Sequence, residues 1–335
     1  MKFDASLPPL SLSQVADAAQ AAEELGFDTL WSSETQHDPF LPLALVSQHT
    51  QSISFGTSVA IAFARSPGTL AYTAWDLAEA SKGRMILGLG TQVRAHIERR
   101  FGMPWPESPV GKLRETVGGI RALWNAWQSG EKLNYRGDYL RLGLMTPFFN
   151  PGPIDHPDIP IYLAGVNTGM CRLAGEVADG FHAHPLNSAE YLSRVIRPAI
   201  NEGADRAGRD PGQIALSVSA FVVTQPGEED FMRSQIAFYA STPSYRPVFE
   251  LHGWGEVAEQ LSGLVRQHKW GEMMELIDDT ILDTFCVRAS EDDLVAALLA
   301  RYRGVVDRLS LYLPFQAGER VDFWTGVIKG IKAAS

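Results

Sequence analysis

Apolar residues recur along the chain at two different spacings, and the two alternate. Between Leu12 and Leu25 the apolar positions fall three or four residues apart, with Ser13 as a candidate N-cap and Gly26 at the end, which predicts an amphipathic helix. Runs of β-branched, aliphatic and aromatic residues flank it at 2–6 and 27–31 and predict strands. A strand, a helix and a strand joined by short turns form a βαβ unit, so we expect a parallel sheet.

The same alternation continues along the chain. Further strands, some of them almost continuously apolar, are predicted at 52–63, 84–90, 160–165, 180–183, 213–224 and 308–315. Further helices are predicted at 42–50, 69–81, 112–130, 167–180, 188–208 and 290–304. We expect a loop at 91–110, a hairpin or extended insertion at 134–153, and a mainly helical insertion at 225–285, between the seventh and eighth strands. Eight strands separated by helices predict a (β/α)8 TIM barrel, an α/β fold, as one domain over residues 1–335.

Composition and charge narrow the function classes. With 45% hydrophobic and 20% charged residues, the chain can bury a large core, and its net charge of −10 disfavours a nucleic-acid or anionic-membrane partner. No apolar run could span a membrane, and the N-terminus has no signal-peptide pattern. The two cysteines, Cys171 and Cys286, have no metal-ligand or disulfide-framework spacing. We therefore expect a cytoplasmic protein that binds no metal and acts on a small molecule.

The segment from Asp28 to Leu43 is the strongest candidate for chemistry. It begins as a strand and then presents Glu34 and His37 among other polar residues, before prolines that delay the next helix. In an α/β barrel, polar groups at the end of a strand lie on the rim where active sites form. The alternative is a solvated βα loop whose charges have no specific role.

Several other features fit a ligand site or a plain structural role. The turn GVNTG after strand 160–165 leads into a helix whose N-terminal N–H groups suit a phosphate, although Asn167 or Thr168 could simply cap the helix. His182 and His184 lie on the sixth strand, and we expect them to point to opposite faces, with one of them toward the barrel mouth. Small residues at 56–58 mark either a bulge near a flat ligand or close core packing. Arginines that could hold an anion, or could simply be solvated, follow strands three and four at Arg65, Arg94, Arg99 and Arg100.

No motif indicates a classical dinucleotide, nucleotide-triphosphate or zinc site. The sequence has no GxGxxG, no GxxxxGK[ST] and no HExxH. An NAD-linked enzyme is therefore disfavoured.

Several stretches together resemble the luciferase-like monooxygenase superfamily, in its branch that uses the deazaflavin coenzyme F420. The stretches that carry the resemblance are ELGFDTLWSSE (24–34), SVA (58–60), DLAEASKGRMILGLGTQ (76–92), PIYLAG (160–165) and EVADGF (176–181). The resemblance implies a TIM barrel with an insertion after strand seven, often a homodimer. It also implies a non-prolyl cis peptide at the end of strand three, which matches Ser58–Val59 here.

The resemblance further implies roles for named residues. Glu34 matches an acidic position near the ring and the substrate, where glucose-6-phosphate dehydrogenase relatives carry Asp-His; this chain has Glu34 and Thr35, with His37 two residues later. We predict Glu34 and His37 as the catalytic residues that move a proton to or from the substrate oxygen. The residues predicted to bind the cofactor are Ser58, Val59, Ala60, Thr91, Gln92, Arg94, His96, Ala164, Gly165, Val166, Asn167, Thr168, Gly169 and His182.

The predicted function is transfer of a hydride between F420 and a small alcohol, carbonyl or unsaturated compound. Two alternatives stay open. One is a monooxygenase that uses FMN in the same barrel, and the other is a cofactor-binding protein without catalytic activity.

Overall fold

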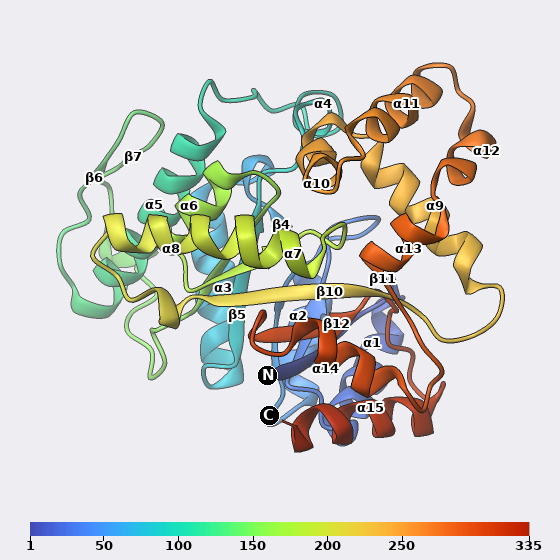
Figure 1. Cartoon of the computed structure of the whole chain (residues 1–335). Coiled ribbons are helices and arrows are strands. Elements are labelled where there is room, and N and C mark those ends of the chain that lie inside the picture. The colour runs from blue at the N-terminus through green and yellow to red at the C-terminus, as the bar shows by residue number, and fades with distance from the viewer. Residues whose placement is uncertain (335) are drawn as a thin grey trace.

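The computed structural model describes residues 1–334, and its centre is a closed barrel of eight parallel strands (Figure 1). Around the barrel the order is β1-β2-β3-β5-β8-β9-β10-β12, and β12 pairs with β1 through Lys2 and Arg308 to close the ring. The barrel strands are β1 (Lys2–Ser6), β2 (Thr29–Ser32), β3 (Ser54–Thr57), β5 (Met85–Gly90), β8 (Ile161–Gly165), β9 (Gly180–Ala183), β10 (Ala215–Val223) and β12 (Arg308–Leu311). The predicted TIM barrel is confirmed.

The third predicted strand differs from expectation. In place of a continuous strand over 52–63, β3 ends at Thr57, and a separate strand β4 (Ala60–Ile61) pairs with β5. The peptide bond Ser58–Val59 between them is cis, as predicted. A short 3-10 turn, η1 (Ala62–Ala64), follows. The apolar run predicted as one strand therefore forms three elements, β3, β4 and η1.

Glycines on β5 allow the broken strand to approach closely. A side chain at Gly88 would place its Cβ 1.8 Å from the Thr57 carbonyl oxygen, and one at Gly90 would lie 2.6 Å from Val59 Cγ2. Thr57 Oγ1 also donates to the Gly88 carbonyl at 2.6 Å. The glycines of RMILGLG therefore permit close packing of β5 against the bend around Ser58.

Helices connect most of the strands and cover the barrel (Figure 1). The first, α1, is capped at Ser11 rather than Ser13, and it ends at Gly26 in the left-handed conformation at φ 90°. The helices outside the segment 228–285 are α1 (Leu12–Leu25), α2 (Phe40–His49), α3 (Pro67–Ser81), α4 (Arg94–Arg99), α5 (Pro109–Ser129), α6 (Thr168–Val177), α7 (Ala189–Tyr191), α8 (Arg197–Arg206), α14 (Leu294–Tyr302) and α15 (Val321–Ala333). A π-helical turn, Leu192–Ile196, joins α7 to α8. The short helix α4 lies where only loop was expected.

The segment 228–285 is mainly helical, as its sequence predicts. It contains α9 (Glu228–Ala240), α10 (Arg246–Glu250), α11 (Gly255–Arg266), α12 (Trp270–Met273) and α13 (Asp279–Phe285). These helices form the orange group at the right of Figure 1, and a further strand, β11 (Cys286–Arg288), follows them and pairs with β10. The expected hairpin over 134–153 is present as β6 (Tyr135–Arg136) and β7 (Arg141–Leu142).

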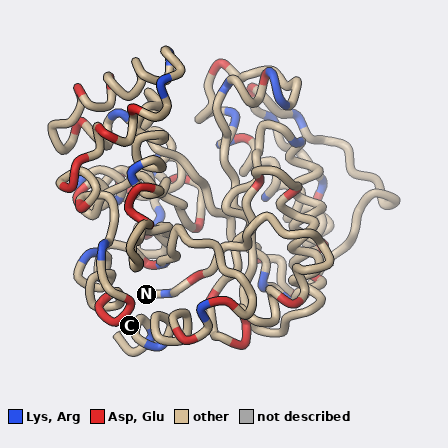
Figure 2. The backbone as a smooth tube through the Cα atoms, turned by 90° about the vertical axis from the view of Figure 1, so that its right-hand side faces the viewer, with Lys and Arg blue, Asp and Glu red and all other residues tan. Residues whose placement is uncertain are grey.

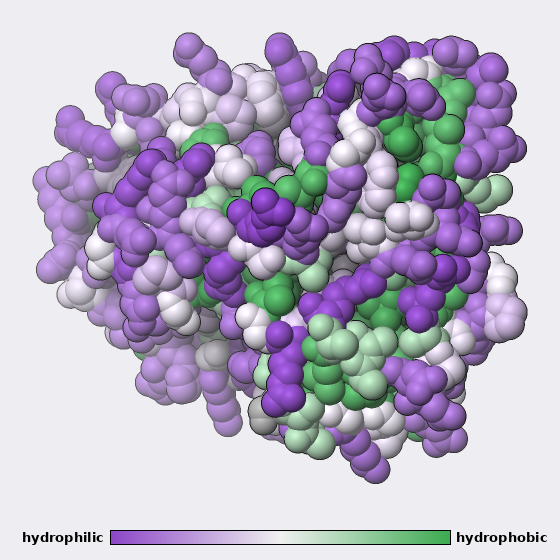
Figure 3. Space-filling view, viewed as in Figure 1, coloured by the Kyte–Doolittle hydropathy of each residue, from purple (hydrophilic) through white to green (hydrophobic). Residues whose placement is uncertain are grey.

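The surface carries both signs of charge, dispersed over the helices and loops (Figure 2). The space-filling view is mostly hydrophilic, with apolar residues gathered at the upper right, in the region of α9 to α12, and at the lower centre, in the region of α14 (Figure 3). Cys171 and Cys286 are both buried and free. Among residues 1–334 no helix has the length and apolar character needed to cross a membrane, and no cluster of His, Cys, Asp or Glu could hold a metal ion.

Candidate active site

Two adjoining cavities open at the carboxyl ends of the barrel strands, the edge where α/β barrels place their sites. The larger, of about 730 Å³, lies over the ends of β1, β2, β10 and β12 and is bounded by the start of α9; we call it the apolar cavity. The smaller, of about 470 Å³, lies between the turns after β5 and β8; we call it the cationic cavity, because Arg94 lines it. Four residues line both: Ser58, His182, Ala183 and Pro185.

The cis peptide lies at the junction of the two cavities. Ser58 lines both cavities, whereas Val59 lines only the cationic one. The Ser58 N–H donates to the Ser32 carbonyl at 2.8 Å, which ties the bend to the end of β2. The bend therefore places a small residue, Ser58, at the space that the cavities share.

His182 is the buried polar side chain at this junction. It is 7% exposed, and its ring lies edge-on to Trp31 with centroids 4.7 Å apart. Its Nε2 has no hydrogen-bond partner among the described residues. Burial, with a smaller contribution from the Arg308 charge, lowers the pKa of His182 to about 3, so the imidazole is neutral at neutral pH.

A buried ion pair supports Trp31 and His182 from below. The Arg308 guanidinium donates two hydrogen bonds to the Asp4 carboxylate, at 2.8 and 2.7 Å, and Trp31 Nε1 donates to the same carboxylate at 3.0 Å. Tyr162 packs against both Trp31 and His182. The floor of the site is thus a fixed polar and aromatic layer inside the barrel.

The helix α6 begins at the wall of the cationic cavity. Asn167 is its N-cap, and its Oδ1 accepts from the Met170 N–H at 3.0 Å. The other N–H groups of a first helical turn have no intrahelical acceptor, and such termini bind anions. Arg94, at the start of α4, lines the same cavity and pairs with Glu98 at 2.9 Å. This cavity therefore combines a cationic side chain with a helix N-terminus.

The predicted catalytic residues lie elsewhere on the rim. The Glu34 carboxylate, 6% exposed, accepts from the Ile61 N–H at 2.7 Å and pairs with Arg65 at 2.5 Å. His37 is exposed and lines a small neighbouring crevice. Of the described residues that line the two cavities, neither Glu34 nor His37 is one. Arg65, which also binds Asp38 at 2.9 Å, holds both carboxylates of this loop, and a catalytic role for Glu34 and His37 stays a prediction.

Most of the residues predicted to bind the cofactor do come together. Those that line the cationic cavity are Ser58, Val59, Thr91, Gln92, Arg94, Ala164, Gly165, Val166, Asn167 and His182. Four others do not line it: Ala60 is fully buried, His96 is exposed on α4, Thr168 Oγ1 accepts from Arg172, and Gly169 lies within α6. Whether any of these residues binds a cofactor stays a prediction.

Several lining residues were not predicted from the sequence. His184 lines the cationic cavity together with His182, because residues two apart in a strand share a face, so the expectation that only one of them faces the mouth was wrong. Its ring packs on Tyr245 at 4.2 Å, and Tyr245 lines the same cavity. Tyr312, just past β12, lines the apolar cavity, and its hydroxyl bonds that of Tyr239 at 2.8 Å. Period-two alternation on β9 could have found His184, but no motif marks the two tyrosines.

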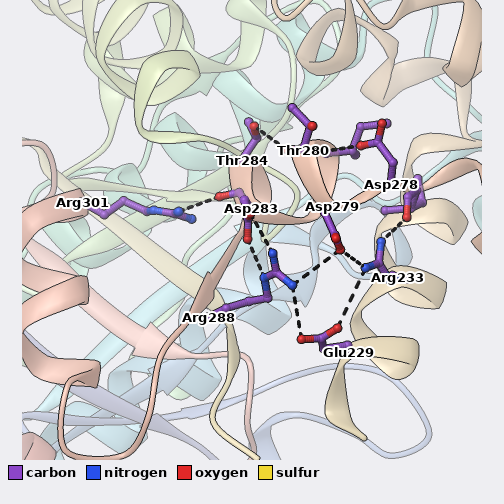
Figure 4. Close-up of polar contacts among 11 residues, drawn as sticks. Glu229, Arg233, Asp278, Asp279, Thr280, Asp283, Thr284, Arg288 and Arg301 are labelled. Atoms are coloured by element: carbon purple, nitrogen blue, oxygen red, sulfur yellow. Dashed lines mark hydrogen bonds and ion pairs between the residues drawn. The ribbon is translucent and has the colours of Figure 1, made fainter. Parts of the chain in front are cut away.

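The start of α9 is held over the apolar cavity by a network of ion pairs (Figure 4). Arg233, on α9, binds Asp279 at the start of α13. Arg288, on β11, binds Glu229 of α9 at 3.3 Å and Asp283 of α13 at 2.5 Å. The network thereby fixes α9 and its cavity-lining residues relative to the barrel.

Comparison with known proteins agrees with this architecture. The luciferase-like monooxygenase family model matches residues 3–308. The chain is 45% identical over 315 residues to an uncharacterized protein of Mycobacterium tuberculosis, with 92% of each chain covered. It is 29% identical to the 5,10-methylenetetrahydromethanopterin reductase of Methanolobus tindarius, covering 87% of each. It is also 33% identical over 220 residues to the F420-dependent glucose-6-phosphate dehydrogenase of Nakamurella multipartita, covering 62% of each.

Solved structures show the same fold. The coenzyme F420-dependent tetrahydromethanopterin reductase of Methanopyrus kandleri superposes with a TM-score of 0.78 at 22% identity, with 99% of each chain covered. The oxygenating component of a diketocamphane monooxygenase of Pseudomonas putida, solved with FMN, superposes with a TM-score of 0.65 at 17% identity, covering 99% of this chain and 96% of that one. With the family model covering most of its length, the chain belongs to the luciferase-like monooxygenase family.

Proposed function

We propose that the protein is an F420-dependent oxidoreductase that transfers a hydride between the deazaflavin and a small organic substrate. One observation carries the proposal. Two cavities with different chemistry meet at the Ser58–Val59 bend: one offers a cation and a helix N-terminus, and the other is apolar. A cofactor with a flat ring and a phosphate-bearing tail needs both, and its substrate needs the space beside the ring.

The residues present fit such a group. His182 lines both cavities with a buried, neutral imidazole that would lie beside a heteroaromatic ring held at their junction. Arg94 and the first turn of α6 would hold the phosphate. The backbone at Ser58 and Val59 would lie against the ring. When bound, the deazaflavin supplies the redox chemistry, as its ring takes or gives two electrons and one proton as a hydride.

The protein's own part is to bind, orient and exclude water. Oxidation of an alcohol carbon also releases a proton from its oxygen, so a group near that oxygen must accept it. The Tyr312 hydroxyl, hydrogen-bonded to Tyr239, is a polar group of the apolar cavity suited to orient this oxygen. We keep His37, which is exposed, as a candidate for carrying the proton from the substrate oxygen to solvent.

The direct test is cofactor binding followed by turnover. The purified protein is titrated with F420 and, separately, with FMN, each followed by the fluorescence of the cofactor. We expect F420 to bind more tightly than FMN, and the F420 absorbance then to change when a substrate is added. Tight binding of FMN alone would instead support the monooxygenase alternative. Binding of F420 with no turnover of any alcohol or carbonyl would support the non-catalytic one.

A further inference from the structure

Among the described residues, no cationic side chain lines the apolar cavity. None of the described residues that line it is a lysine or an arginine, and its histidine, His182, is neutral. Its wall over the barrel includes Val222, Phe231, Met232 and Leu311. An anion that entered would lose water without gaining a cation, and buried charges in proteins are normally paired.

The one charged residue that lines this cavity in the described chain is a carboxylate, Glu228. Its Oε2 accepts from the Thr224 and Gln225 N–H groups at 2.7 and 3.1 Å. Its Oε1 lies 3.9 Å from Arg320, which also pairs with Glu291 at 2.6 Å. Arg320 is therefore already shared between two carboxylates, and it does not line the cavity. A substrate anion would meet the negative charge of Glu228 alone.

The rim arginine Arg65 is also engaged in ion pairs. Arg65 binds both Glu34, at 2.5 Å, and Asp38, at 2.9 Å. Its charge is neutralised by the loop that carries those two carboxylates. A phosphate at the cavity entrance would have to displace a carboxylate to reach it.

Hydroxyl groups supply most of the polarity of the cavity. Ser217, Ser219, Ser310 and Tyr312 all line it. Hydroxyls both donate and accept hydrogen bonds, so they match the oxygen of an alcohol or a carbonyl. They do not offer the fixed positive charge that a phosphate or a carboxylate needs.

We propose that the substrate is an uncharged molecule with an apolar body and a hydroxyl or carbonyl oxygen, and that phosphorylated and carboxylated compounds are excluded. This rests on the proposed function, because the cavity is taken as the space beside the F420 ring. Exclusion follows from charge: Glu228 repels an anion, and no cation in the lining compensates for its desolvation.

The test compares probes of one shape and different charge. Isothermal titration calorimetry on the protein saturated with F420 measures binding of cyclohexanol, cyclohexanecarboxylate and cyclohexyl phosphate. We expect cyclohexanol to bind at least about tenfold more tightly than either anion. Equal or tighter binding of an anion overturns the inference, and so does failure of cyclohexanol to bind.

The design separates this inference from the proposed function. If F420 itself does not bind, the proposed function fails. The three probes are then titrated into the protein in excess inorganic phosphate, which occupies the anion site of the cationic cavity, and the same ranking is expected for the apolar cavity. If the protein binds F420 but binds cyclohexyl phosphate most tightly of the three probes, the proposed function stands and the proposed substrate class is wrong.

A positive charge introduced at the edge of the apolar cavity tests whether charge is what excludes anions. Phe231, which lines the cavity, and Phe238, which does not, lie on the same helix and are 53% and 50% exposed. F231R should raise the ratio of cyclohexyl phosphate affinity to cyclohexanol affinity roughly fivefold. F238R should leave this ratio unchanged. Equal effects of both variants on the ratio, or no effect of F231R, would show that charge in this cavity does not select the substrate.

Discussion

The cationic cavity and the apolar cavity share four lining residues but are built from different parts of the chain. The cationic one is formed by the turns after β5 and β8, with Arg94 and the N-terminus of α6. The apolar one is formed by the ends of β1, β10 and β12 and by α9. One cavity can therefore retain a charged cofactor tail while the other rejects charge, and the substrate class can change without loss of the cofactor site.

The largest expected effect comes from the floor common to both cavities. R308L leaves Asp4, which is 1% exposed, as a buried carboxylate without its cation. Asp4 also accepts the Trp31 Nε1–H, so the loss of Arg308 removes the residue that orients this acceptor. We expect the free energy of unfolding to fall by about 3–5 kcal/mol, measured by urea denaturation.

R301L is the matched control for R308L. Arg301, on α14, donates to the Asp283 carbonyl of α13 at 2.7 Å, outside the barrel floor. We expect a loss of about 1 kcal/mol for this variant. A loss from R308L no larger than this would show that the ion pair does not hold the floor.

The next effect is a dependence of stability on pH. Burial lowers the pKa values of both His182 and His184 to about 3, whereas a histidine in the unfolded chain titrates near 6.5. Below pH 6.5 the unfolded state binds more protons than the folded one, so acid favours unfolding. Each histidine should remove roughly 2 kcal/mol of stability between pH 7 and pH 5.

The double variant H182L/H184L isolates this contribution. The free energy of unfolding is measured by urea denaturation at pH 7 and at pH 5. Its fall between the two pH values should be roughly 4 kcal/mol smaller for the variant than for the wild type. Carboxylates that titrate in the same range affect both proteins alike. An unchanged pH dependence would mean that neither imidazole is held neutral.

A smaller effect separates the cavities by cofactor binding. R94A removes the guanidinium of the cationic cavity, and we expect F420 to bind roughly tenfold more weakly while the relative affinity for cyclohexanol and cyclohexyl phosphate stays the same. R99A, on the same helix α4 but outside the cavity lining, is the control. Equal losses from both variants would indicate a diffuse electrostatic effect rather than a contact.

The variant Y312F changes the apolar cavity and leaves the cationic cavity intact. It removes a hydroxyl that lines the apolar cavity and breaks the bond to Tyr239, while the ring remains. We expect kcat/KM for an uncharged alcohol to fall about tenfold, with F420 affinity unchanged. Y245F, whose ring lines the cationic cavity, should leave that kcat/KM within about twofold. If Y312F weakened F420 binding instead, the two cavities would not divide the ligands as proposed.

The sequence predicts the cationic cavity much better than the apolar one. Many of its residues lie at the ends of recognisable strands and in the turns that follow them, such as 164–167 at the end of β8, so strand ends bring them to one rim. The cis bond at Ser58 was predicted from the family resemblance, whereas the small residues at 56–58 alone left a bulge and close core packing as alternatives. Glycines of β5 mark the same bend from the other side.

The apolar cavity could not be predicted in the same way. Phe231 and Tyr312 are far apart in sequence, and each resembles an ordinary apolar or aromatic position on its own element. Their meeting depends on how α9 is held against the barrel by Arg233 and Arg288 (Figure 4). Pairing partners of charged residues, such as Arg65 for Glu34, are equally invisible to a pattern of residue types.

The smallest expected effect concerns the rim loop that was the strongest candidate from sequence. His37 is exposed and lines neither cavity, so H37A should leave kcat within about threefold of wild type, because solvent can carry the proton in its place. The measurement is F420 reduction by an uncharged alcohol across pH 6–8. A loss of roughly 100-fold would instead show that His37 reaches the substrate oxygen. E34Q provides the comparison: it weakens the pair with Arg65, so an effect on stability without an effect on kcat would assign this loop to structure.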